Sequence, residues 1–121
     1  MSCVHLLCSD HPLPLCAPQC DKDGFAVRPL AYYRTAVDDL GVSMKPCRYE
    51  VELHATAQDA AALRDYLTQH CTPGEAVELW HLWVGDVNVR AFRLAGRLAD
   101  LDTDTLEQLN EREQTCIILT L

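Results

Sequence analysis

The segment from Ala76 to Val84 is apolar on both sides of a strand, and this feature most constrains the fold. Its β-branched and aromatic residues favour an extended backbone, in which successive side chains point to opposite faces. One set is Val77, Leu79 and Trp83, and the other is Trp80, Leu82 and Val84. Only Glu78 and His81 interrupt the apolar run. The strand therefore requires other elements to cover both of its faces.

The residues before this strand predict a strand followed by a helix. Apolar and polar side chains alternate from Cys47 to His54, which predicts a strand with Tyr49, Val51 and Leu53 toward the helix layer and the opposite face in water. Thr56 and Asp59 have nearly the spacing of a capping box, and an apolar stripe at helical spacing follows. Thr72-Pro73-Gly74 ends this helix.

The residues after this strand predict a hairpin, a second helix and a last strand. Gly85-Asp86 is a two-residue turn signal, so we expect the chain from Val87 to about Leu94 to return antiparallel. The stretch 92–101 fits either a strand or a helix. Asp104 and Glu107 mark another helix start, and the segment from Thr115 to Leu121 is a nearly continuous apolar strand.

This order of elements predicts an α+β fold. Strand, helix, strand, hairpin strand, helix and strand over residues 47–121 is the split βαβ order of ferredoxin-like domains. In that arrangement both helices cover one face of the sheet, and the other face stays open. A doubly wound α/β sheet, using the first strand and helix of the chain as a further βα unit, is the alternative.

The first 46 residues predict a strand, a long loop and a helix that pack on residues 47–121 within one domain. Ser2 to Ser9 is largely apolar on both faces, which predicts a buried strand. The loop from Asp10 to Gly24 contains three prolines and ends in a turn signal. Apolar residues at helical spacing then predict a helix over 29–40, ended by Gly41.

The open face of a ferredoxin-like sheet conflicts with the doubly apolar strand. Trp80, Leu82 and Val84 would form an exposed apolar patch, and patches of this kind mark interfaces. We therefore expect these three residues to form the interface of a homodimer. If the N-terminal 46 residues cover this face instead, the protein can be a monomer.

Composition excludes several classes of partner. The 121 residues carry a formal net charge of −8, which disfavours nucleic acid and anionic membranes. No targeting segment or membrane span is visible. Seven cysteines form an odd, irregularly spaced set in a chain large enough to fold without disulfides. These observations predict reduced thiols and a cytoplasmic location.

Cysteine and histidine are concentrated at the N-terminus, where a metal could bind. Cys3 and Cys8 would point to opposite faces of a strand and cannot chelate together. The spacing of the others matches no usual zinc motif, so we predict no metal. If a metal binds, the candidate ligands are His5, His11, Cys16 and Cys20.

The residues best placed to contact a ligand lie on the long loop and at one strand end. These are His11, Cys16, Cys20 and His54. Cys71 adjoins a helix C-terminus, where the dipole disfavours a thiolate, so we interpret it as a packing residue. No motif indicates a catalytic residue or a cofactor.

The sequence therefore predicts a small, cytoplasmic, non-enzymatic binding or regulatory domain. Two alternatives stay open. One is a metal-binding or thiol-redox protein that uses the N-terminal loop. The other is an enzyme in which His54 or His81 acts as an acid or base.

Overall fold

A computed structural model describes residues 3–16 and 24–121, which form one open six-stranded sheet with helices on its two faces. The strand order is β2-β3-β1-β4-β6-β5. The strands are β1 (Cys3–Ser9), β2 (Ala26–Pro29), β3 (Cys47–Glu52), β4 (Ala76–Trp83), β5 (Phe92–Arg97) and β6 (Thr115–Thr120). The helices are α1 (Arg34–Asp39), α2 (Ala57–His70) and α3 (Thr103–Asn110), with a 3-10 turn, η1 (Leu98–Asp100). The protein is therefore a mixed α+β molecule.

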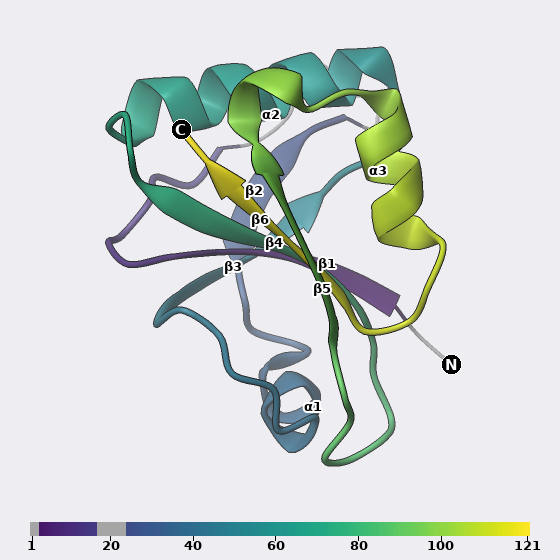
Figure 1. The fold of residues 1–121 in the computed structure, drawn as a ribbon. Coiled ribbons are helices and arrows are strands. Elements are labelled where there is room, and N and C mark those ends of the chain that lie inside the picture. The colour runs from purple at the N-terminus through teal and green to yellow at the C-terminus, as the bar shows by residue number, and fades with distance from the viewer. Residues whose placement is uncertain (1–2, 17–23) are drawn as a thin grey trace.

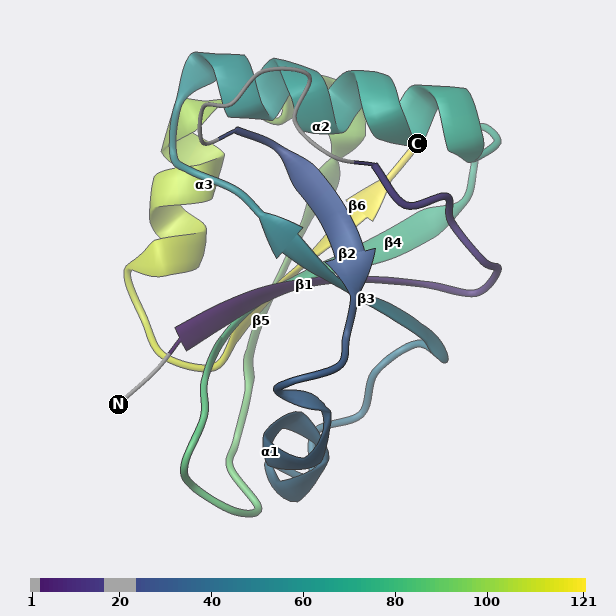
Figure 2. The ribbon, with the colours of Figure 1, turned by 180° about the vertical axis from the view of Figure 1, so that it is seen from behind.

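The doubly apolar segment forms β4, which lies between β1 and β6 inside the sheet. Figure 1 and Figure 2 show α2 and α3 over one face of the sheet and α1 over the other. Each face of β4 is therefore covered by a different layer, as the alternation of its apolar side chains requires.

The core on the α2 and α3 face joins both helices to the central strands. Leu63 and Leu67 of α2 and Leu106 and Leu109 of α3 are buried there. The strand residues in this core include Leu7, Leu79 and Ile117. Tyr49, Val51 and Leu53 also pack in it, so the side of β3 predicted to face the helices is confirmed.

The core on the α1 face corrects the predicted homodimer interface. Trp80 and Leu82 are fully buried and Val84 is 8% exposed. They pack in one cluster with Val37 of α1 and with Leu40. Residues from the N-terminal part of the chain therefore cover this sheet face. Because these three side chains are not at the surface, the predicted dimer interface at Trp80, Leu82 and Val84 is wrong.

The predicted hairpin after β4 is also wrong. β5 pairs with β6 in parallel, with Leu94 opposite Ile117, and β6 separates it from β4. The connection runs past the end of α1 instead of turning tightly, because the amides of Asn88 and Val89 donate to the carbonyls of Asp39 and Leu40. The apolar β6 takes the inner position and the largely exposed β5 takes the edge.

This pairing differs from both predicted topologies. A ferredoxin-like sheet would pair β4 with β5, whereas here β6 lies between these two strands. The doubly wound alternative does not fit either, because the other neighbouring strands pair antiparallel. The α+β class is confirmed, while the ferredoxin-like arrangement of residues 47–121 is not.

The N-terminal residues form part of the sheet rather than an extension that packs on it. β1 is a central strand, and it is buried on both faces as predicted. Residues 26–29, of which Pro29 was predicted to begin a helix, form β2, so α1 is limited to 34–39. The ambiguous stretch 92–101 divides into β5 and η1. Among the described residues, no helix has the length and apolar character needed to cross a membrane.

Candidate functional site

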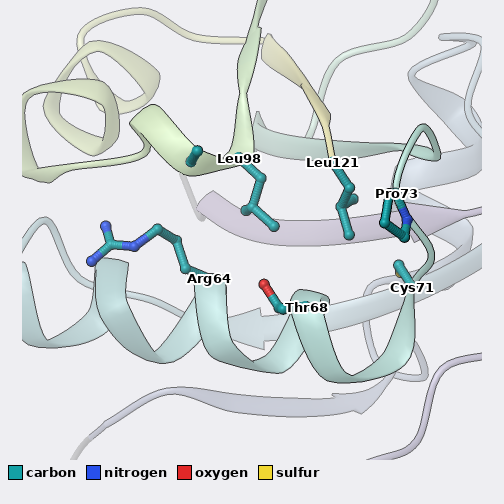
Figure 3. Close-up of a pocket in the computed structure, with 7 residues that line it drawn as sticks. Arg64, Thr68, Cys71, Pro73, Leu98 and Leu121 are labelled. Atoms are coloured by element: carbon teal, nitrogen blue, oxygen red, sulfur yellow. The ribbon is translucent and has the colours of Figure 1, made fainter.

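A pocket of about 230 Å³ opens between α2 and the layer formed by η1 and the end of the chain. Figure 3 shows Thr68 of α2 facing Leu98 and Leu121 across this gap, whereas the Arg64 side chain extends away from Leu121. The lining residues are Arg64, Thr68, Cys71, Pro73, Leu98, Ala99 and Leu121. Most of the lining is apolar, and the one charged side chain, Arg64, lies at the end opposite Pro73 and Cys71.

The pocket depends on how α2 is held. Thr56 Oγ1 accepts a hydrogen bond from the Asp59 amide at the start of the helix, as the near capping box predicts. Arg64, Thr68 and Cys71 then follow at helical spacing on one side. The Arg64 guanidinium donates to the Leu101 carbonyl, which ties α2 to the residues just after η1.

The chain after α2 forms a turn of defined type. The Glu75 amide donates to the Thr72 carbonyl at 3.1 Å, and Gly74 has a φ of +93°. Proline at the second position and glycine with positive φ at the third are typical of a type II turn. Leu121 exchanges backbone hydrogen bonds with Gly74 and Glu75, at 2.8 and 2.9 Å. The turn is therefore fixed against the end of β6.

The start of the long loop packs against this turn. The Leu13 amide donates to the Tyr49 hydroxyl at 2.8 Å, and the Tyr66 hydroxyl donates to the Pro14 carbonyl. These contacts hold His11 beside the turn, with its Nε2 atom 2.9 Å from Glu75 Oε1.

Three potential metal ligands meet at this point. One ligand atom each from His11, Cys71 and Glu75 lies within 4.8 Å of the others. The three residues come from the loop after β1, the end of α2 and the turn before β4. Cys71 belongs both to this cluster and to the lining of the pocket, so the two features adjoin.

The surroundings shift the pKa values of Cys71 and Glu75 in opposite directions. Burial raises the pKa of the Cys71 thiol, and the nearby Glu75 carboxylate raises it further. The Thr72 amide hydrogen bond lowers the pKa of Glu75, and His11 contributes in the same direction. Near neutral pH the arrangement therefore holds a thiol beside an ionised carboxylate.

The other predicted site residues lie elsewhere. His5, on β1, stacks on His81 at 5.0 Å and contacts Asn110 Oδ1 at 2.7 Å. Cys16 forms an isolated bridge with Val27 and packs on the core of the α2 face. His54 contacts Asp59 Oδ2 at 3.1 Å, beside the N-terminus of α2. Cys20 lies outside the described residues.

The structure therefore brings together one predicted residue, His11, with two that were not predicted. Cys71 was interpreted as packing, and Glu75 was not considered. The Thr72-Pro73-Gly74 signal does predict a turn that brings Cys71 and Glu75 close to each other. No local pattern connects that turn to His11, which lies 60 residues earlier than Cys71. No family model, curated protein or solved structure matches the chain.

Proposed function

We propose that the chain is a small single-domain binding or regulatory protein that acts in the cytoplasm without catalysing a reaction. Its ligand in this proposal is a small organic acid with an apolar body. The observation that carries the proposal is the pocket beside α2, whose lining is apolar apart from the rim and which has Arg64 at one end. Concave apolar sites with a few polar groups are the usual form of small-molecule sites.

Pocket size and charge support this ligand class. A volume of about 230 Å³ is below the range of drug-sized ligands, roughly 300–1,000 Å³. It suits a short aliphatic chain or a single ring. The Arg64 guanidinium uses one N–H on the Leu101 carbonyl and has others for a carboxylate.

The remaining parts of the proposal follow from the lining and the overall charge. Among the lining residues that the structure describes, the strongest nucleophile is the Cys71 thiol, whose raised pKa favours the unreactive protonated form. The net charge of −8 disfavours phosphate backbones and anionic lipid as partners. Free thiols at the described cysteines are compatible with the reducing cytoplasm.

Titration calorimetry with short-chain and medium-chain carboxylic acids and their primary amides tests the proposal. We expect the acids to bind better than the amides. Thr68→Trp, at the pocket rim, should abolish binding, whereas the matched Gln69→Trp on the next exposed position of α2 should not. Arg64→Gln should remove the preference for acids. The proposal fails if no acid binds, or if both tryptophan variants lose binding equally.

A further inference from the structure

We propose that His11, Cys71 and Glu75 bind one zinc ion. The site adjoins the proposed pocket and shares Cys71 with it, but zinc binding there does not depend on an organic acid in the pocket. Imidazole nitrogen, thiolate sulfur and carboxylate oxygen are all zinc ligands. The mixed set excludes calcium and magnesium, which prefer oxygen alone.

The separations between the ligand atoms fit a tetrahedral ion. Zinc bonds of about 2.0–2.3 Å hold neighbouring ligand atoms roughly 3.3–3.8 Å apart. The ligand atoms of all three residues already lie within 4.8 Å of one another. His11 Nε2 and Glu75 Oε1, at 2.9 Å, have to separate by only a few tenths of an ångström. Three protein ligands leave a fourth position for water.

Outer hydrogen bonds orient two of the ligands. His11 Nδ1 lies 3.1 Å from the Pro12 carbonyl, which can only accept, so Nδ1 carries the proton of that hydrogen bond. The Nε2 atom then faces the cluster. Glu75 Oε2 accepts from the Thr72 amide, which leaves Oε1 for the metal. Zinc ligands in proteins are usually fixed by outer contacts of this kind.

Binding changes the protonation of the cluster in a defined way. The Cys71 thiol loses its proton to solvent as the zinc–sulfur bond forms. Zinc binds the unprotonated Nε2 atom of His11, so any proton on that atom also leaves to solvent as the bond forms. No oxidant or reductant is required. Because the three ligands come from three separate segments, zinc would also stabilise the packing of the loop on the turn.

Zinc and cobalt titrations of the full chain test the site. Native mass spectrometry should show one zinc ion per chain, and cobalt should give the charge-transfer band of a cobalt–thiolate bond. Cys71→Ser should remove that band. His11→Gln and Glu75→Gln should each weaken zinc binding by at least about tenfold, the loss that even an outer-shell change produces.

Matched variants separate this site from the other cysteines and histidines. Cys47→Ser and His54→Gln change residues outside the cluster and should leave binding unchanged. The proposal is overturned if the chain binds no zinc. It is also overturned if His5→Gln, Cys16→Ser or Cys20→Ser removes binding while the cluster variants retain it. If Cys71→Ser does not fold, the variants of the partly exposed His11 and Glu75 decide the question.

Discussion

Gly41 shows how a single residue fixes the position of α1. Its φ of +70° lies in the left-handed region, and a Cβ atom there would stand 2.9 Å from Asn88 Oδ1. Gly41→Ala should therefore destabilise the protein by about 1–2 kcal/mol, the cost of the left-handed conformation for other residues. Urea unfolding measures the loss. Gly96→Ala is the control, because nothing lies within 4 Å of its added Cβ and its φ is not positive. Equal losses in both variants would contradict this account.

The carboxyl of Asp102, at the start of α3, makes the stability of the fold depend on pH. Its side chain accepts from the Thr105 amide at 2.9 Å, and this hydrogen bond lowers the pKa of the carboxyl from its ordinary value. A lowered pKa means that the ionised form stabilises the fold above the unfolded value and that this contribution disappears as pH falls through the folded value. Asn can also cap a helix but carries no charge.

We therefore expect Asp102→Asn to be less stable than the natural chain near neutral pH, with a difference that narrows as the pH falls toward the folded pKa of Asp102. Chemical unfolding of both proteins from neutral pH to about pH 3 measures the difference. A gap that stays constant across this range would mean that the charge of Asp102 does not contribute.

Glu78 is a buried carboxylate whose hydrogen-bond partners could not be predicted from the sequence around it. The sequence identifies it as an interruption in an apolar strand, and the structure shows it 8% exposed. Its Oε1 atom accepts from the Lys45 amide at 2.8 Å and from Trp80 Nε1 at 3.3 Å. Burial of a carboxylate requires such partners. The Lys45 partner is 33 residues away, so no local pattern contains it.

At the scale of elements, α1 is short but covers one face of the sheet. Leu40, directly after it, is fully buried with Trp80 and Leu82. Leu40→Ala should therefore cost about 2–5 kcal/mol, as other buried leucines do. Asp39→Ala, at an exposed neighbouring position, should change stability by less than about 0.5 kcal/mol. Similar losses in thermal or urea unfolding would show that this face is not packed as described.

Elements with local signals were predicted well, and elements defined by distant pairing were not. Helix α2 begins directly after Thr56, because the Thr56 hydroxyl accepts from the Asp59 amide and caps the helix. β3 follows from an alternation that repeats every two residues, and β4 follows from a run of β-branched and aromatic residues that is apolar on both faces. In contrast, Gly85-Asp86 favours a hairpin, but β6 takes the place beside β4. Strand order depends on which strand buries more apolar surface, and that is a comparison across the whole chain.

At the scale of the molecule, the candidate site is assembled by the same long-range packing. The sequence predicted His11 as a ligand, from its residue type and its place on a loop. Its partners depend on the contacts of Tyr49 and Tyr66 with the loop, which no spacing reveals. The sequence therefore predicts that His11 can act as a ligand, but it does not predict the residues that lie beside it. The distances that join the loop to the turn come from the fold.

The fold also predicts which thiols react. Cys3 is exposed, whereas Cys8 and Cys116 are fully buried on the α1 side of the sheet. Burial raises the pKa of Cys116 to about 12 and raises that of Cys8 as well, with the nearby Glu78 carboxylate adding to both. Because the thiolate is the reactive form, these two thiols should be protected near neutral pH by both their protonation and their lack of access.

Alkylation of the native protein with iodoacetamide, followed by peptide mass mapping, measures this order. We expect Cys3 to be modified much faster than Cys8 and Cys116. The same reaction in denaturant is the control, since there the three thiols should react at similar rates. Protection in the native protein reports opening of the sheet, so it should decrease in Leu40→Ala, which weakens the layer over Cys8. Native rates that are equal at Cys3 and Cys8 would contradict the central position of β1.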